Sequence, residues 1–396
     1  MRLVLYTGKG GVGKTTTAAA TAVCAATRGR RTLVASADAA HSLGDVLGRR
    51  LGPTPEPVVE NLDAIEIDAR VEMLRHWGSV REFLVATFEH QGIDAVVAEE
   101  LALLPGAEEL TTLLAVEDAA RAEHYDFIVV DCAPTDSTLR LLTLPEVAHG
   151  FLRVVLPILA ALSGVATPIA RRIVSAPLPG RAVFRDVKDL VYHQLGSLQK
   201  RLSDPSTSVR MVVTPERMVI DEARRAHTDL ALFEVGCDAV IMNRVLPPAA
   251  ADEEFFREWS RLQVERRREV EELFAPLPVL AAPLAEDEVI GLERLAAHGD
   301  TIFTDAEPDA TLSRAPQVRF TRKGDDYLAI VPLPGADADG LDVARVGDEL
   351  VITTGTRRRA LKLPRRFVSL DLAAARLADG AMTVAFKRRQ AADARA

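Results

Sequence analysis

The 396-residue chain has few cysteines and few aromatic side chains. It contains three cysteines, two tryptophans and four tyrosines. Cys24, Cys132 and Cys237 are scattered and too few for the disulfide framework of a small secreted domain, so they indicate a reducing compartment. A fold held together by disulfides is thereby excluded.

Long apolar runs are also lacking. No stretch approaches the roughly 20 apolar residues of a membrane-spanning helix, and no apolar segment precedes the first predicted strand at residue 3. We therefore expect no secretion signal, no stable membrane insertion and a cytoplasmic location. The net charge is −9, with +5 on residues 316–396 and −14 on the rest. An acidic main part argues against nucleic acid as a partner.

What the chain does contain is an alternation of apolar runs and helical segments up to about residue 298. This pattern is typical of an α/β fold, a mostly parallel sheet flanked by helices. The expected strands are Leu3–Tyr6, Thr32–Ser36, Ala64–Ile67, Phe127–Asp131, Val209–Thr214, Ala239–Met242 and Val279–Ala282. The expected helices include Thr15–Arg28, Glu108–Glu123, Pro215–Val235 and Asp252–Phe274.

The pattern of apolar and turn-forming residues changes near the C-terminal end. A polar stretch within His298–Pro316 predicts a linker, which we place at 301–315. Short β-like runs separated by Gly, Pro and Asp then predict a small all-β sandwich at 316–390. The sequence thus predicts an α/β domain at 1–300, a linker and a β domain.

A glycine-rich loop between the first strand and the first helix indicates phosphate binding. The predicted nucleotide-binding residues there are Gly8, Lys9, Gly10, Gly11, Val12, Gly13, Lys14, Thr15 and Thr16. Glycines let successive N–H groups turn toward the phosphates, and the helix N-terminus adds partial positive charge. Lys14 is expected to reach the phosphates and Thr15 to ligate Mg²⁺. The ligands implied are ATP and Mg²⁺.

Lys9 is one lysine more than the loop pattern requires. A cation supplied from a second subunit can neutralise charge that develops on a transferred phosphoryl group. The arrangement resembles the "deviant" loop of the signal-recognition, MinD and BioD class of ATPases, in which the first lysine crosses a dimer interface. The alternative is a solvated loop charge.

Acids follow two predicted strands at the edge where an open α/β sheet binds its ligand. Asp38 comes after the second strand, and there it would orient the attacking water, although such an acid also serves as a helix cap. Asp131 ends a buried strand and predicts a Mg²⁺ ligand, together with Thr15 and Asp38. Asn243 follows a later strand, where it would read the adenine edge or simply form a turn.

Three motifs in order resemble the ArsA/Get ATPase family. They are Lys-Gly-Gly-Val-Gly-Lys-Thr-Thr, then Ser-x-Asp-x-Ala-His-Ser-Leu, then Asp-x-Ala-Pro-Thr followed by Thr-Leu-Arg-Leu-Leu. Met242–Val245 and the segment around Pro283 and Leu284 resemble that family's nucleotide-proximal segments, which adds these two residues to the expected site. The resemblance covers about residues 1–300.

The resemblance implies an activity and an assembly. Asp38, Lys9 and Lys14 would be catalytic, Asp131–Arg140 would form the second switch, and a homodimer would close on ATP. The segment 147–205 would be a helical insertion that binds a hydrophobic client, such as a membrane-protein segment. Ordinary helix packing is the alternative for this apolar segment.

The tail resembles the α-crystallin (small heat-shock) sandwich, carried by Tyr327–Gly335, Asp348–Ile352 and Ala378–Val384. This module is fused to some members of the ATPase family. The chain lacks the Ile-x-Ile tail typical of oligomer-forming heat-shock proteins, so we expect an accessory domain. The basic clusters 357–359 and 387–389 are expected to be solvated strand ends, with contact to anionic lipid or nucleic acid as the alternative.

The sequence departs from the family in its cysteines. Targeting factors carry a Cys-x-x-Cys that shares zinc across the dimer, but no cysteine lies between Asn243 and Gln263, so we predict no zinc site. Cysteines of the arsenite pump are not recognisable, and a single P-loop is present. These features favour membrane-protein targeting or chaperoning over anion efflux. A MinD/ParA-type positioning ATPase stays a second alternative.

Overall fold

The computed structural model describes residues 1–38, 42–101, 107–132, 194–324 and 326–388, with single positions between 183 and 189. The chain divides into two compact units, which we describe separately. The first consists of Met1–Thr207 with Glu286–Ala310, and the second of Ser208–Ala285 with Thr311–Ala396.

The first unit is built on strands in the order β3-β4-β2-β5-β1. Their bounds are β1 Arg2–Thr7, β2 Thr32–Ser36, β3 Glu56–Val59, β4 Leu62–Glu66 and β5 Phe127–Asp131. All pairs are parallel except β3 with β4. β1, β2 and β5 are buried along their whole length, as their apolar runs predict for strands covered on both faces.

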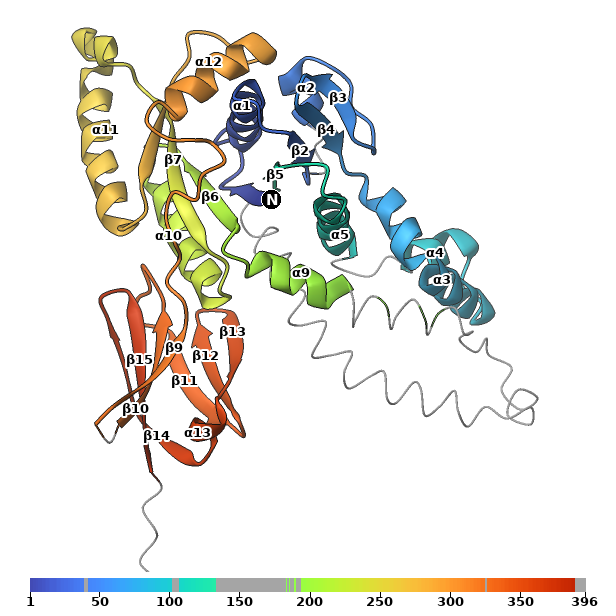
Figure 1. Ribbon diagram of the computed structural model, residues 1–396, viewed down its shortest axis with the longest axis vertical. Coiled ribbons are helices and arrows are strands. Elements are labelled where there is room, and N and C mark those ends of the chain that lie inside the picture. Colours follow the sequence, from blue (N-terminus) through green and yellow to red (C-terminus); the bar gives the residue numbers. More distant parts are fainter. Residues whose placement is uncertain are drawn as a thin grey trace, which may run out of the picture. The chain divides into compact units, whose positions relative to one another are not determined.

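The helices of this unit are α1 Lys14–Thr27, α2 Leu43–Leu47, α3 Ala69–His90, α4 Ala95–Leu101, α5 Ala107–Arg121, α9 Leu195–Leu202 and α12 Leu292–Ile302. α1 is rich in alanine and packs beside α12 (Figure 1). The approach is close, because a Cβ added at Gly299 would lie 2.5 Å from the Ala20 carbonyl oxygen. Small residues on both helices therefore set the position of α1.

The second unit begins with three more parallel strands in the order β6-β7-β8. The bounds are β6 Thr207–Val213, β7 Cys237–Val245 and β8 Val279–Pro283, with helices α10 Arg217–Leu232, η2 Pro248–Asp252 and α11 Glu254–Leu273. Buried Arg210 and Asp238 form an ion pair at 3.2 Å between β6 and β7. This pair satisfies two charges that would otherwise be costly to bury.

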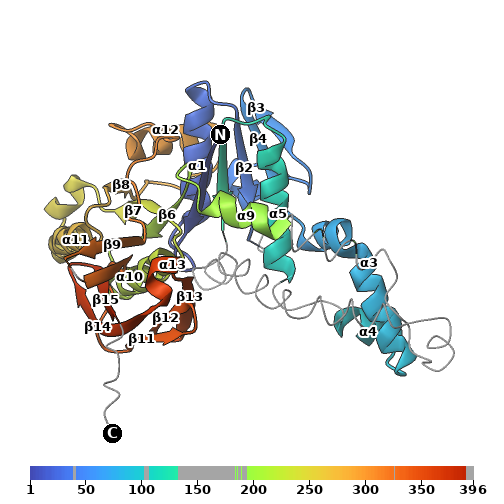
Figure 2. The same ribbon diagram turned by 60° about the horizontal axis from the view of Figure 1, so that its bottom comes forward.

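The rest of the second unit is an antiparallel β sandwich (Figure 2). One sheet has the order β14-β15-β10-β9 and the other β11-β12-β13. The bounds are β9 Arg319–Lys323, β10 Asp326–Pro332, β11 Leu341–Val346, β12 Glu349–Thr354, β13 Arg357–Lys362, α13 Arg365–Val368, β14 Leu370–Ala378 and β15 Ala381–Arg388. Phe367 on α13 makes edge contacts with three other aromatic rings and so closes the core.

Helix α10 is attached to this sandwich. Its Leu232 is part of the sandwich core, and Arg224 donates to the Asp337 carboxylate at 3.1 and 3.2 Å. Arg359 is 6% exposed and donates to Glu234 at 2.7 Å and to the Leu232 carbonyl. The expectation that cluster 357–359 is a solvated strand end is thus wrong for Arg359, because α10 supplies its partners.

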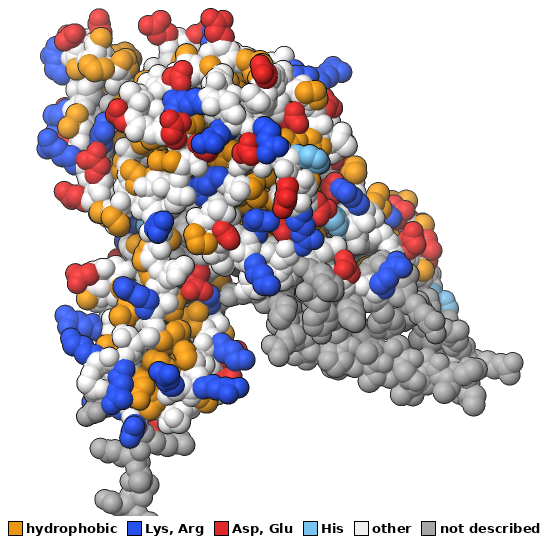
Figure 3. All heavy atoms as spheres, in the orientation of Figure 1, with side chains coloured by type: hydrophobic (Ala, Val, Ile, Leu, Met, Phe, Trp, Pro, Cys, Tyr) orange, Lys and Arg blue, Asp and Glu red, His pale blue; other side chains and the backbone are white. Residues whose placement is uncertain are grey.

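The fold class predicted from the sequence is confirmed: a mostly parallel sheet with flanking helices, then an all-β module. Within the predicted linker, Phe303 is fully buried, and Arg28 donates to the carbonyls of Phe303 and Ala306. Figure 3 shows many lysine and arginine side chains over the sandwich, in line with its positive charge. The domain boundaries stay predictions.

Parts of the predicted layout lie outside the described residues. They are the stretch 133–140 of the second switch and most of the helical insertion 147–205, of which α9 is described. Among the described helices, none has the length and hydropathy to cross a bilayer.

Candidate functional site: a phosphate loop and the adjoining strand ends

The glycine-rich loop connects β1 to α1 through left-handed backbone. Gly11 has φ 80° and Gly13 has φ 90°, conformations that favour glycine. A Cβ added at Gly10 or Gly11 would meet no atom within 4 Å, so that side of the loop is open. The loop is closed on itself by Val12 N–H, which donates to the Lys9 carbonyl at 3.4 Å. Backbone shape and open space fit a bound phosphate.

The N-terminus of α1 begins within this loop and is uncapped. Its first turn contains no acidic residue, and Gly13 at the N-cap offers no side chain to accept the N–H groups. These groups and the helix dipole form an anion site when no capping group occupies them. Lys14 is the first helical residue and is 7% exposed, so its charge lies within the loop region. The Thr15 hydroxyl lies 3.1 Å from the Ser42 hydroxyl.

Three polar side chains at the carboxyl ends of β1, β2 and β5 are buried and without a hydrogen-bond partner among the described residues. They are Thr7, Ser36 and Asp131, with both carboxylate oxygens of Asp131 included. Asp131 stands in register with Tyr6 and Ser36 on the flanking strands, so the three groups share one edge. Buried polar groups rarely remain unpaired, so this edge is shaped for a polar ligand.

The environment of Asp131 opposes its charge in the absence of a ligand. Burial raises the pKa of Asp131 to about 7, and the nearby Asp38 carboxylate adds to the rise. The Thr15 hydroxyl, which approaches the carboxylate without reaching hydrogen-bonding geometry, and the Lys14 ammonium act in the opposite direction and lower this pKa. Thr15, Lys14, Asp38 and Asp131 are therefore close enough to interact. A buried acid with both oxygens unpaired, near a hydroxyl and a second acid, fits the oxygen ligands that Mg²⁺ prefers.

Asp38 is half-buried and follows β2 by two residues. Residues 39–41 lie outside the described part of the chain, and the N-cap of α2, the next described helix, is Ser42. Cys132, directly after Asp131, is 2% exposed.

The other predicted nucleotide residues belong to the second unit. Asn243 lies inside β7 rather than after it, and its Oδ1 accepts the Arg244 N–H at 2.9 Å. Leu284 N–H donates to the Val245 carbonyl at 2.8 Å, which brings Pro283 and Leu284 beside the end of β7. The three residues are thus neighbours, and their contact with a nucleotide stays a prediction.

Sequence reasoning did not include Thr7, Ser36 and Ser42 among the site residues. The available signal was their position: Thr7 and Ser36 end β1 and β2 at the edge where a parallel sheet binds its ligand, and Ser42 is the N-cap of α2. A hydroxyl residue is common in loops, so position alone did not distinguish them.

The loop, the uncapped helix and the strand-end acids define a P-loop nucleotide-binding protein. Comparison with known families agrees: residues 1–304 match the model of the anion-transporting ATPase (ArsA) family, and residues 324–386 match the HSP20-like domain found in ArsA. The chain belongs to the ArsA ATPase family, and it is an ATPase.

Relatives cover nearly the whole chain. It is 34% identical to "Putative arsenical pump-driving ATPase 1" of Aquifex aeolicus, over 94% of this chain and 96% of that protein. It is 36% identical to "Putative arsenical pump-driving ATPase" of Chlorobaculum tepidum, over 94% and 92%. It is also 28% identical to "ATPase ASNA1 homolog" of Trypanosoma cruzi, over 78% and 93%. The first two names describe a pump-driving ATPase, and the third describes an ATPase.

Proposed function

We propose that the chain is a Mg²⁺-dependent, homodimeric ATPase whose nucleotide cycle opens and closes a client-binding surface, in membrane-protein targeting or chaperoning. The observation that carries the nucleotide part is the buried, unpaired Asp131 carboxylate near Lys14, Thr15 and Asp38. The client part is supported by the family resemblance and by the similarity to the ASNA1 homolog.

Each residue of the site has a proposed role. Backbone N–H groups of Gly8–Thr16 bind the phosphates, and Lys14 places its charge beside them. Thr15, Asp131 and Asp38 would hold Mg²⁺, which when bound neutralises charge on the phosphate oxygens. Asp38 would also accept a hydrogen bond from the attacking water and so orient it. Lys9 would reach the nucleotide of a second subunit.

In this scheme, the conformational change of the nucleotide cycle is a change in how the two subunits of the homodimer are arranged. ATP bound by both copies adds contacts across the dimer, and hydrolysis removes them, so each state favours a different arrangement. Asn243, Pro283 and Leu284 are the residues proposed to contact the base. This scheme requires no zinc.

Two other functions remain as alternatives. An anion-efflux ATPase is favoured by the printed names of the bacterial relatives, and stimulation of turnover by arsenite or antimonite would establish it. A positioning ATPase of the MinD/ParA type requires binding to membrane or DNA, which co-sedimentation with liposomes or DNA would detect.

The variant Asp38→Asn tests the catalytic assignment. We expect it to bind ATP with near wild-type affinity and to hydrolyse it at least about a hundredfold more slowly, the range for a lost general base. Asp45→Asn, an exposed acid on α2, is the matched control and should retain activity. Unchanged turnover in Asp38→Asn would remove Asp38 from the mechanism.

The same variant tests the client proposal. Bound to ATP but unable to hydrolyse it, Asp38→Asn should retain clients during affinity capture from native cells. Enrichment of single-span membrane proteins over the Asp45→Asn control would support targeting. Recovery of soluble proteins alone, or of none, would contradict it.

A further inference from the structure

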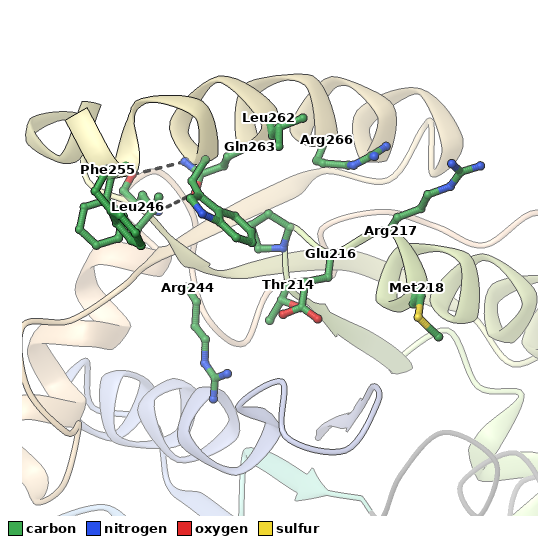
Figure 4. A pocket seen from close by; sticks show the side chains of 13 residues that line it. Thr214, Glu216, Arg217, Met218, Arg244, Leu246, Phe255, Leu262, Gln263 and Arg266 are labelled. Carbon is green, nitrogen blue, oxygen red and sulfur yellow. Dashed lines mark hydrogen bonds between the residues drawn. The ribbon is translucent and has the colours of Figure 1, made fainter. Parts of the chain in front are cut away.

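The hydroxyl of Ser36 is a buried polar group without a partner in the described part of the chain. At the hollow beside α11 and its exposed rings Phe255 and Trp259, by contrast, the fold pairs a half-buried polar group. The Gln263 side chain there accepts the Leu246 N–H at 2.7 Å and donates to the Leu246 carbonyl at 3.4 Å (Figure 4). Ser36 is 0% exposed at the end of β2, and its Oγ makes no hydrogen bond to a described residue. An unpaired buried group is rare and often marks a functional position.

Ser36 lies on the face of the sheet that α1 covers. Residues in register on neighbouring parallel strands carry their side chains on the same face. Ser36 is in register with Asp131 on β5, and Asp131 is in register with Tyr6 on β1. The Tyr6 hydroxyl lies 2.6 Å from the Thr21 hydroxyl on α1, which identifies the face. The Ser36 hydroxyl and the Asp131 carboxylate are therefore neighbours on the side of the sheet where the helix of the phosphate loop packs.

Hydrogen bonds hold the main chain on both sides of this pair. The Ala37 N–H donates to the Asp131 carbonyl at 2.8 Å, and the Ile67 N–H donates to the Ser36 carbonyl at 3.1 Å. The end of β2 is thus tied to β5 on one side and to the residue that follows β4 on the other. Both side chains are mounted on rigid main chain, as a positioned site requires.

Asp131 needs a hydrogen-bond donor when it binds a metal ion. A carboxylate that ligates a metal is itself held by a hydrogen bond from a neighbouring group, and neither oxygen of Asp131 has one among the described residues. Thr15 is assigned to the metal itself. Thr7 follows Tyr6 in β1, so its side chain points to the opposite face of the sheet. Ser36 is the unpaired hydroxyl on the correct face and on the adjacent strand.

We propose that Ser36 is a positioning residue of the magnesium site: its hydroxyl donates to a carboxylate oxygen of ionised Asp131 and holds this side chain in its metal-binding orientation. The proposal rests on the Mg²⁺ role proposed for Asp131 above. Ser36 acts through Asp131 and is assigned no contact with the nucleotide or the attacking water. Its hydroxyl contributes to metal binding and not to the stability of the unliganded fold.

The variant Ser36→Ala distinguishes a positioning role from a purely structural one. Urea unfolding of the unliganded full chain at pH 6, where most of Asp131 is protonated, should give a midpoint no lower than that of wild type, because no hydrogen bond is lost. Mg²⁺ with a non-hydrolysable ATP analogue should raise the melting temperature of both proteins. The Mg²⁺ concentration for half of this rise should be about 10–100-fold higher in the variant, the range for a lost partner of a metal ligand.

Thr207→Val is the matched control. The Thr207 hydroxyl is also buried without a described partner, but Thr207 begins β6, whereas the ligand edge is formed by strand ends. Its removal should not lower the urea midpoint either. The Mg²⁺ concentration for half of the rise in melting temperature should equal that of wild type.

Combining Ser36→Ala with Asp131→Asn tests whether Ser36 acts through Asp131. An asparagine offers no carboxylate for the hydroxyl to hold. The double variant should therefore require no more Mg²⁺ than Asp131→Asn alone, as expected for two residues that contribute to one interaction.

The outcomes separate this inference from the proposed function. If Asp131→Asn weakens the response to Mg²⁺ and Ser36→Ala does not, the positioning role is overturned and the metal role of Asp131 stands. If Asp131→Asn leaves the response unchanged, the metal role fails and the positioning role fails with it. A urea midpoint of Ser36→Ala below that of wild type at pH 6 would assign the hydroxyl to the fold. Additive effects in the double variant would show that it acts independently of Asp131, and each of these two results overturns the inference.

Discussion

Ser36 and Asp131 stand opposite each other on β2 and β5, and both side chains are fully buried without a hydrogen-bond partner in the described residues. An unpaired buried polar group costs about 1–3 kcal/mol. A polar ligand that pairs with these groups would remove this cost and stabilise the folded protein. We therefore expect the groups that catalysis needs at this edge to lower the stability of the unliganded protein.

The substitution Asp131→Asn should raise the stability of the unliganded protein and slow ATP hydrolysis. Because the pKa of Asp131 is raised from 3.8 to about 7, the folded protein holds a proton between these pH values that the unfolded chain has released. Folding stability from this group is therefore present at low pH and lost as pH rises toward 7. Asparagine does not titrate, so the free energy of unfolding of the unliganded variant should exceed that of wild type at pH 8, and this gap should shrink toward pH 4.

Urea unfolding at several pH values measures this difference. The same variant should hydrolyse ATP at least about tenfold more slowly if Asp131 helps to hold the metal. Equal stability of variant and wild type at pH 8 would mean that the carboxylate has partners in solution that the described residues do not supply.

The loop and the strand-end acids could be predicted from the sequence because local patterns determine them. Gly13, Lys14 and Asp131 each occupy a position fixed by a strand end or a helix start, and those boundaries are visible as changes in hydrophobic pattern. The same is true of the β module, whose alternating strands carry their own turn residues. These elements required no knowledge of distant contacts.

Long-range partners could not be predicted in this way. Arg359 was expected to be solvated because three arginines in a row are usually exposed, but Glu234 and the Leu232 carbonyl, about 125 residues earlier, bind it. The short strand β3 was missed because its residues alternate only partly and pair antiparallel at the edge of the sheet. The exposure of Phe255 and Trp259 depends on what lies around α11, which the sequence does not state.

The close packing of α1 on α12 predicts a strong effect of one methyl group. In Gly299→Ala the new Cβ would lie 2.5 Å from the Ala20 carbonyl oxygen and 2.8 Å from the Cys24 Cβ, so the helices must separate. We expect a loss of about 1–3 kcal/mol in urea unfolding. Gly78→Ala is the matched control: it lies inside α3, its Cβ would meet no atom within 4 Å, and it should gain about 0.5–1 kcal/mol.

The attachment of α10 to the sandwich can be tested at Arg359. Arg359→Met keeps the apolar stem but leaves Glu234 and the Leu232 carbonyl without their donor. We expect the free energy of unfolding to fall by about 2–3 kcal/mol, as for a lost hydrogen bond to a charged group. The exposed neighbour Arg358, changed to methionine, should stay within about 0.5 kcal/mol of wild type. Equal effects of the two substitutions would contradict the attachment.

His227 on α10 should make the second unit sensitive to acid. Its ring stacks on Phe274 with centroids 5.6 Å apart, and burial lowers the pKa of His227 from 6.5 to about 4. Between these values the unfolded chain binds a proton that the folded protein excludes, so stability is lost as pH falls from 6.5 toward 4, by about 3 kcal/mol at most. In His227→Leu this loss disappears, and the free energy of unfolding of the variant relative to wild type should rise as pH falls from 7 to 4.5. A difference that stays constant over this range would show that the histidine titrates alike in both states.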